Sequence, residues 1–426
     1  MRPVAVMTAA AATAAALLAA PTGAQPAAAP GQLRWDDPVL VTADRGSREM
    51  SLVIDPADER RMFACGPSSL RNTIGQSHYF QTGDAGRTWS YVDVETDPDD
   101  TRGVPADGGD CDVAYDDAGT MYVADTWVGN VSVGASRDGG RTWRGTALGV
   151  TGAIIDRPWI VAPGEPGVVY LTWHGLQTHM PSLMWFAKST DYGATFSRPV
   201  VVTTANETGG FTWHGNFVAS PDGQHIYTIS TRRLSQAQGF VKPDENQLNV
   251  SHDGGATWAR STISVLPHST APDTLYPVIA MDGGGHLHAA WTAARTEAGD
   301  VPLWYTTSTD RGATWSTPIA VAEGPGWTGW APWLAGGPKA GQAGAGWLAS
   351  DSTTPREHGS WWAAYATFDS GRLTAVGRTT ADPLYTGTQT IPEFEAARID
   401  RHGRLHLGIA VFGADGTWSL YHQRSR

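Results

Sequence analysis

Lysine is almost missing from this sequence of 426 residues, which contains only Lys188, Lys242 and Lys339. Positive charge therefore has to come from arginine, whose planar guanidinium binds carboxylates through paired N–H donors. Charged residues of all kinds make up only 17% of the chain, and the formal net charge is -12. This acidic balance excludes general nucleic-acid binding, because that function requires a basic surface to displace counterions.

Cysteine is equally scarce, and downstream of the N-terminus no apolar run is long enough to span a bilayer. We therefore expect no membrane-spanning segment in the folded part of the chain. Glycine and tryptophan, in contrast, are abundant, with 50 Gly and 19 Trp, and 41% of the residues are hydrophobic. The hydrophobic fraction excludes wholesale disorder. Many glycines and tryptophans with few charges indicate an all-β protein with many tight turns.

The first residues have the pattern of a targeting segment. Arg2 is followed by a run rich in Ala and Leu, and then by small residues and prolines. This pattern predicts a secretory signal peptide over residues 1–24, with a Pro/Ala-rich tail to about residue 31. A membrane anchor is the alternative interpretation. We expect the mature protein to be secreted and a single domain to cover residues 32–426.

Five segments repeat one pattern, Ser/Thr-x-Asp-x-Gly-x-Thr-Trp/Phe, at intervals of about 53 to 62 residues. We call them the repeat turns, and they span residues 82–89, 136–143, 189–196, 251–258 and 308–315. The pattern is typical of a hairpin turn, because an Asp carboxylate can accept backbone N–H groups and Gly supplies a positive φ. We therefore assign a structural role to the five aspartates, Asp84, Asp138, Asp191, Asp253 and Asp310.

The repeat turns are similar to the Asp box, or bacterial neuraminidase repeat, of sialidase-like β-propellers. The resemblance implies that each box lies on the rim of a propeller, away from the face that binds ligand. It covers the whole mature chain at the level of the fold and does not carry a function with it.

A second repeat lies between the repeat turns and consists of an apolar strand, an Asp/Gly turn and another apolar strand. Seven such hairpins occur, at residues 50–66, 111–126, 158–174, 216–231, 277–293, 332–350 and 395–411. Residues 33–42 have the signature of an outer strand, and residues 418–423 that of a third strand with no outer strand after it. We therefore predict a seven-bladed β-propeller whose last blade is closed by the N-terminal strand. Blade six, residues 361–378, has lost its repeat turn.

The two cysteines fall at corresponding ends of neighbouring blades in this scheme. Cys65 ends the second strand of blade one, and Cys111 begins the first strand of blade two. Both ends point to the same face, and an exported protein meets oxidising conditions. We therefore expect a disulfide between them.

The residues that enter the seven inner hairpins predict the mouth of the central channel. Aligned, they form a ring of Glu49, Asp110, Arg157, Gly215, Tyr276, Ala331 and Phe394. This ring mixes acids, one cation and aromatics, which is typical of a pocket for a polar ligand.

Polar and aromatic side chains in and beside this ring are our candidate site residues. The candidate catalytic residues are Asp156, His174, His214 and Tyr276, since either histidine can move a proton near neutral pH. Tryptophans stack on sugar faces, and arginines hold a carboxylate through paired donors. The candidate substrate-binding residues are Asp110, Arg157, Trp213, Arg232, Arg295, Trp330 and Arg356. Arg157, Arg295 and Arg356 would clamp an acidic sugar if they converge.

The resemblance leaves the reaction open. A sialidase needs three arginines on the substrate carboxylate, a Tyr nucleophile helped by a Glu, and an Asp acid. Its Arg-Ile-Pro signature is missing before the first repeat turn, and the nearest trace is Asp156-Arg-Pro-Trp159. Sialidases have six blades, and seven-bladed relatives include xyloglucan hydrolases and non-enzymatic assembly factors.

Our main hypothesis is a secreted carbohydrate-active enzyme. It would be a glycoside hydrolase, exo-sialidase-like or of another specificity, or else a polysaccharide lyase. The alternative is a non-catalytic propeller that binds a glycan or a protein. In either case we expect a monomer whose partner is a carbohydrate, with an acidic glycan as one candidate.

Metal and cofactor chemistry has little support in the sequence. His286 and His288 share one strand face without a third ligand, so core or rim histidines are expected there. The acidic segment over residues 97–112 could hold a structural Ca²⁺ but lacks the EF-hand spacing. We expect no cofactor.

Overall fold

A computed structural model describes most of the chain after residue 29. The described ranges are 30–42, 45–69, 76–94, 109–127, 130–148, 154–176, 183–203, 213–232, 244–268, 277–296, 301–352, 359–387, 396–413 and 416–426. Residues 1–29, which contain the predicted signal peptide, lie outside them. Within the described ranges, no helix has the length and apolar character needed to cross a bilayer.

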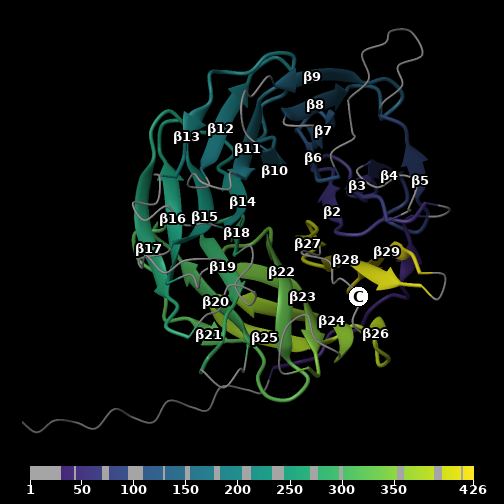
Figure 1. Ribbon diagram of the computed structural model, residues 1–426, viewed down its shortest axis with the longest axis vertical. Helices are drawn as coiled ribbons and strands as arrows, with labels where there is room; N and C mark the ends of the chain where they lie inside the picture. The colour runs from purple at the N-terminus through teal and green to yellow at the C-terminus, as the bar shows by residue number, and fades with distance from the viewer. Residues whose placement is uncertain are drawn as a thin grey trace, which may run out of the picture.

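The described strands form seven antiparallel sheets, and these are arranged as blades around a central axis (Figure 1). Blade one contains β2 (Ser51–Ile54), β3 (Met62–Pro67), β4 (Ser77–Thr82) and β5 (Ser90–Val92). Blade two contains β6 (Cys111–Tyr115), β7 (Met121–Trp127), β8 (Asn130–Ser136) and β9 (Arg144–Leu148). Blade three contains β10 (Ile154–Val161), β11 (Val169–Leu176), β12 (Met184–Ser189) and β13 (Val200–Val201). Blade four contains β14 (His214–Ala219), β15 (Ile226–Arg232), β16 (Glu245–Ser251) and β17 (Ala259–Val265). Blade five contains β18 (Val278–Met281), β19 (Leu287–Thr292), β20 (Leu303–Ser308) and β21 (Ile319–Ala320). Blade six contains β22 (Thr328–Gly336), β23 (Gln342–Ser350), β24 (Gly359–Asp369) and β25 (Arg372–Arg378), and β26 (Tyr385–Gly387) pairs with β24.

Blade seven joins the two ends of the chain. Its strands are β27 (Ala396–Ile399), β28 (Leu405–Phe412), β29 (Trp418–Arg424) and the N-terminal β1 (Val39–Leu40). In the register of the last pair, Val39 lies opposite His422 and Leu40 opposite Tyr421. The predicted all-β, seven-bladed propeller, closed by the N-terminal strand, is therefore confirmed.

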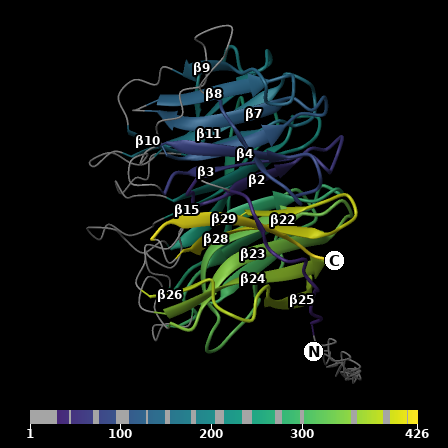
Figure 2. The same ribbon diagram turned by 90° about the vertical axis from the view of Figure 1, so that its right-hand side faces the viewer.

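Each blade alternates direction from its inner strand outward, so the ring has two distinct faces, which Figure 2 views from the edge. We call one the mouth face, where the inner strands begin and the second strands end. We call the other the turn face, where the repeat turns join the third strands to the fourth. The faces matter because the predicted site residues belong to the first and the repeat turns to the second.

One network of hydrogen bonds builds all five repeat turns. In the fourth turn, Ser251 Oγ and the Thr257 N–H both donate to Asp253 Oδ1, over 2.8 and 2.9 Å, and Thr257 Oγ1 donates to Oδ2 over 2.6 Å. The Gly255 N–H donates to Ser251 Oγ over 2.8 Å. The same four contacts recur in the other turns. The hydrogen bonds from Thr257 lower the pKa of Asp253 to about 2, which is the expected result for a carboxylate that accepts several donors.

The glycine of each repeat turn contacts the third strand of the preceding blade. Gly255 has φ +92°, and a Cβ there would lie 2.0 Å from Cε1 of Phe186 on β12. The corresponding glycines of the other turns face His422, Gln81, Val133 and Leu248, each on the third strand of the blade before. The glycine thus allows both a left-handed backbone and a close approach between blades.

Blade six lacks the full pattern but keeps this contact. Gly371, in the tight turn between β24 and β25, has φ +78°, and a Cβ there would lie 3.0 Å from Thr307 on β20. On the outer side of blade six the N-terminal segment pairs with β25. The Gly31 N–H donates to the Thr374 carbonyl over 2.8 Å, and the Val376 N–H donates to the Gly31 carbonyl over 3.1 Å. The start of the described chain therefore fastens blade six before it completes blade seven.

We predict that Gly255→Ala destabilises the fold more than Gly254→Ala does. Both positions have a positive φ, which costs an alanine about 1–2 kcal/mol. At Gly254 a Cβ meets nothing nearer than 3.7 Å, so this variant is the matched control for backbone strain alone. Gly255→Ala also overpacks against Phe186, which adds about 1–3 kcal/mol. Urea denaturation of both variants measures the difference, and equal losses would contradict the contact.

Candidate active site at the mouth face

Left-handed backbone conformations mark the predicted ring of channel-mouth residues. Glu49, Arg157 and Ala331 have φ of 58°, 54° and 51°, although none is glycine. Register shifts accompany Arg157 in β10 and Ala331 in β22, where the inner strand bulges before it continues. Such conformations cost about 1–3 kcal/mol each and cluster at functional sites. The bulges turn these positions out of the regular strand, at the start of the inner strands of three blades.

Two carboxyl groups from neighbouring blades are hydrogen-bonded to each other at this mouth. Asp110 comes directly before β6, and Asp156 lies on β10 next to Arg157. Desolvation raises the pKa of Asp110 well above its usual value, against the attraction of Arg157, and the contact with Asp156 raises it further. Burial also acts to raise the pKa of Asp156, but the contacts with His174 and Asp110 lower it below its usual value. The two pKa shifts have opposite directions, so a proton shared by the pair is held more tightly by Asp110 than by Asp156.

A third carboxyl group and one guanidinium complete the charges around this pair. Glu49 of blade one acts on Asp110 as a like charge, and Arg157 acts on both members of the pair as an opposite charge. The Glu49 and Arg157 residues are both buried. Burial keeps these interactions strong, because little water screens them.

Two buried histidines lie behind the carboxyl pair. His174 on β11 is opposite Asp156 in the register, and its Nε2 lies 3.3 Å from Asp156 Oδ2. The ring of His214, which begins β14 in blade four, lies 5.2 Å from the His174 ring. The structure therefore brings four of the predicted site residues into contact from three blades: Asp110, Asp156, His174 and His214.

Covalent and hydrogen-bonded links hold this part of the mouth in place. Cys111, the residue after Asp110, forms a disulfide with Cys65 of blade one, as the sequence predicted. The Asp110 N–H donates to Thr126 Oγ1 over 3.2 Å, which anchors it to β7. Two residues further along the chain, on β6, Asp112 accepts hydrogen bonds from Ser51 Oγ of blade one and from the Ile160 N–H of blade three. Blades one, two and three are thereby fixed to one another beneath the site.

The centre of the ring below the mouth is filled by side chains. Trp159 on β10 and Trp333 on β22 belong to blades that are not neighbours, and their rings lie 5.3 Å apart. Both residues are buried. The guanidinium of Arg398 on β27 lies 5.8 Å from the Trp333 ring, and its charge acts on Asp112. A ligand that enters from the mouth face therefore meets a floor of aromatic and charged groups.

Other predicted ligand-binding residues have partners elsewhere. Arg295 makes a two-point ion pair with Glu323, which follows β21 at the outer edge of blade five. Arg232 lies 3.1 Å from Glu245 on β16, the third strand of its blade. Both arginines are thus engaged with carboxylates outside the innermost strands, and we do not carry them into the site.

The tryptophans predicted to stack on sugars differ in exposure. Trp330 is only 1% exposed and belongs to the apolar core between blades six, seven and one, so it presents no open ring face. Trp213 is half-buried, packs against the same core cluster and enters β14 beside His214. Trp213 therefore remains a candidate, whereas Trp330 does not. Tyr276 and Arg356 lie outside the described residues.

Glu49 was in the aligned ring but was not among the residues we selected, and the structure adds it. Its sequence signal was the alignment itself, since it occupies the same position as Asp110 and Arg157. Arg398 and Asp112 were also not selected. The signal available for them was their charge at inward-facing positions of apolar inner strands.

The remaining histidines of interest are structural. His288 Nδ1 lies 2.7 Å from the Tyr305 hydroxyl, and its Nε2 lies 3.1 Å from Asp282 Oδ2. His406 bridges Asp400 and His422 in the same way, over 3.3 and 3.0 Å. Within the part of the chain that the structure describes, no group of three or more His, Cys, Asp or Glu side chains could hold a metal ion. The acidic segment over residues 97–108 lies outside that part.

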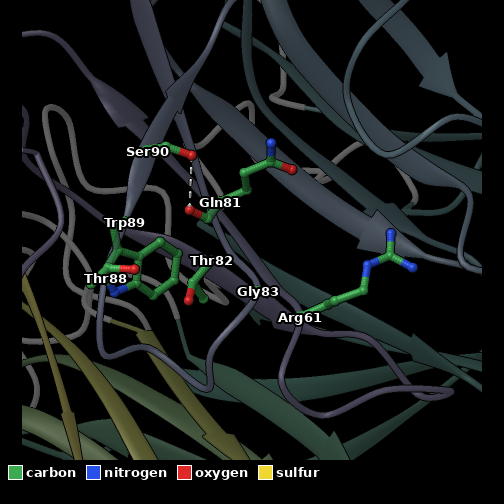
Figure 3. A pocket seen from close by; sticks show the side chains of 7 residues that line it. All are labelled: Arg61, Gln81, Thr82, Gly83, Thr88, Trp89 and Ser90. Atoms are coloured by element: carbon green, nitrogen blue, oxygen red, sulfur yellow. Dashed lines mark hydrogen bonds between the residues drawn. The ribbon is translucent and has the colours of Figure 1, made fainter.

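Three surface pockets adjoin the repeat turns rather than the mouth. A pocket of about 350 Å³ lies on the turn face of blade one, and Figure 3 shows its lining: Arg61, Gln81, Thr82, Gly83, Thr88, Trp89 and Ser90. In that view the Arg61 side chain extends away from Trp89, so the two do not converge on a common point. Two more pockets, of about 310 and 370 Å³, lie where a repeat turn meets the preceding blade. Their recurrence at blade junctions indicates grooves between blades.

Comparisons with known proteins agree with the fold. No protein-family model matches the sequence, and no curated protein matches it. A solved structure of a protein of unknown function from Dyadobacter fermentans has a TM-score of 0.53 at 12% identity, covering 92% of this chain and 99% of that one. An ancestral GH74 enzyme has a TM-score of 0.50 at 13% identity, covering 92% of this chain and 48% of that one.

An α-L-arabinofuranosidase from Fusarium graminearum has a TM-score of 0.48 at 11% identity, covering 93% of this chain and 97% of that one. At such low identities, likeness establishes the fold and not the reaction. The fold and the mouth together define a β-propeller with an acidic cluster at the start of its inner strands.

We predict that removing the disulfide destabilises the protein. The bond closes a loop with a sequence separation of 46 residues, for which the chain-entropy model gives up to ~4 kcal/mol. Cys65→Ser/Cys111→Ser should therefore unfold at a lower urea concentration than the oxidised wild type. The reduced wild type is the matched control, because it should resemble the double variant. Mass spectrometry that finds both thiols free in exported protein would refute the prediction.

Proposed function

We propose that this protein is a secreted glycoside hydrolase that cleaves a glycan at its mouth face, with Asp110 as the proton donor. The observation that supports this most is the contact between the Asp110 and Asp156 carboxyl groups, in which the pKa of Asp110 is raised and that of Asp156 is lowered. Glycoside hydrolysis needs a carboxylic acid that is still protonated near neutral pH, and desolvation with a neighbouring carboxylate is how proteins provide one.

Glu49 is the second carboxylate in this proposal. Hydrolases place their two working carboxyl groups ~5–5.5 Å apart for retention or ~6.5–9.5 Å apart for inversion. Asp110 and Asp156 share a hydrogen bond and are therefore too close to flank a glycosidic bond on opposite sides. Glu49 comes from the neighbouring blade and acts on Asp110 through its charge. This interaction does not require the two carboxyl groups to be hydrogen-bonded to each other. Glu49 is the better candidate for the nucleophile or the base.

Charge at the mouth favours an uncharged sugar over an acidic one at the point of cleavage. Arg157 faces two carboxyl groups. Of the two other arginines expected to clamp a substrate carboxylate, Arg295 is paired with Glu323, and Arg356 lies outside the described residues. A substrate anion would approach three acidic side chains and compete with them for one guanidinium. The Asp-box resemblance and the predicted signal peptide support an exported, glycan-directed propeller.

A non-catalytic binding propeller is the second candidate. It is favoured by the position of the pockets, since those lined by the described residues adjoin repeat turns or lie between blades. The half-buried Trp213 at the edge of the mouth would suit a binding surface.

We predict that Asp110→Asn lowers the turnover of a neutral chromogenic glycoside by about 10²–10⁴-fold. The loss should be much smaller for dinitrophenyl glycosides, because their leaving group needs no proton. In the wild type, kcat/KM should fall as the pH rises through the raised pKa of Asp110, since only the protonated form donates. This alkaline limb should disappear in Asp110→Asn.

A matched control is Asp222→Asn, which changes an exposed aspartate on the turn face. It should leave both rate and pH profile unchanged. If a panel of neutral and acidic glycosides gives no turnover while a glycan array shows binding that Arg157→Ala removes, the hydrolase proposal fails and the binding propeller is supported.

A further inference from the structure

We infer that His174 is a positioning residue of the mouth site, which keeps Asp156 ionised so that the shared proton stays on Asp110. This inference rests on the proposed function, because it concerns the protonation state of the proposed acid. It assigns a role to a buried histidine that does not face the substrate itself.

The backbone fixes the contact between His174 and Asp156. The two residues are directly opposite each other on β10 and β11, which is the shortest cross-strand separation available to a pair of side chains. The His174 Nε2 lies 3.3 Å from Asp156 Oδ2, and His174 is 1% exposed. A buried imidazole in this position has no water to bind in place of the carboxylate.

The next blade holds the His174 ring from the other side. The His214 ring lies 5.2 Å away at an interplanar angle of 44°, and His214 is fully buried. Its strand, β14, bulges immediately after His214. The imidazole of His174 is thus packed between blade four and the carboxylate that it contacts. Its orientation toward Asp156 follows from that packing.

The charged groups around Asp156 come from every neighbouring element. Asp110 from blade two and Glu49 from blade one are acidic, Arg157 is the adjacent cation, and His174 and His214 lie behind. Without His174, Asp156 would lose the contact that contributes most to lowering its pKa. Asp156 would then bind a proton more readily, and the two forms of the pair would become closer in energy.

The sign of the effect follows from this balance. In the wild type the shared proton favours Asp110 over Asp156. In His174→Ala the second proton of the pair, on Asp156, binds at a higher pH. The acid limb of the kcat/KM profile reports protonation of the coupled cluster of Glu49, Asp110 and Asp156, so it moves upward. A hydrogen-bonding or charged neighbour shifts the pKa of a carboxylate by about 1–3 units, so we expect a shift of about one unit or more. The plateau rate also falls, because part of the shared proton moves to Asp156.

The test compares His174→Ala with His174→Gln and His288→Gln. Gln keeps an N–H donor near the position of Nε2 but cannot carry a charge, so His174→Gln should move the acid limb less than His174→Ala. His288 is also a fully buried histidine in contact with an aspartate, and it lies in blade five. His288→Gln should therefore lose stability without moving the pH profile. A loss of rate in His174→Ala with an unmoved acid limb would overturn the inference.

A second measurement does not depend on turnover. An infrared pH titration of wild type, Asp110→Asn and His174→Gln reports protonated carboxyl groups directly. We expect a protonated carboxyl near neutral pH that Asp110→Asn lacks, and one further carboxyl that gains its proton at higher pH in His174→Gln than in wild type. Identical carboxyl titrations in His174→Gln and wild type would overturn the positioning role. If these shifts occur but no glycoside is cleaved, the positioning role stands and the proposed hydrolase activity fails.

Discussion

Seven sheets in a closed ring must each pack against two neighbours, and in this protein the repeat turns provide that junction on one face. The carboxylate of each turn orders its own backbone, and the glycine two residues later then approaches the third strand of the preceding blade. At Gly86, Gly255 and Gly312 this approach is so close that no Cβ fits. The contact is the same whether the facing residue is Phe186, Leu248 or His422. The turn motif requires the glycine whatever residue it faces on the preceding blade. One short sequence can therefore make the same contact between successive blades while the rest of each blade differs in sequence.

Because the repeat turns lie on the turn face, the mouth face is available for functional residues. At the mouth, the inner strands begin with bulges instead of a regular ladder, and charged residues occupy strained positions that glycine would occupy at lower cost. The disulfide and the hydrogen bonds of Asp112 hold three blades rigidly beneath them. A half-buried carboxyl pair needs such support, since its shared proton depends on separations that small movements would change.

Sequence alone predicted the blade count, the closing strand and the disulfide, because each depends on repeated spacing and on apolar alternation. The same alignment found Glu49 and Arg157 at equivalent positions without any knowledge of their backbone angles. It could not find the partners of side chains. Asp110 and Asp156 meet because a bulge redirects one of them, and Arg295 meets Glu323 across a blade. Trp330 shows the same limit, since a tryptophan beside a predicted mouth can equally fill the core.

The N-terminal segment has a consequence for the order of events during folding. Gly31 pairs with β25 of blade six, and β1 pairs with β29 of blade seven, so the first described residues are partners of some of the last. These contacts span most of the chain, which makes them slow to form. Until the C-terminal strands have been synthesised, the N-terminal segment and the exposed edge of blade one have no partner. Ring closure is therefore the step at which unpaired strand edges invite association with other chains. The dependence of folding on chaperones should therefore be determined more by the time between the synthesis of β1 and that of β29 than by the stability of any single blade.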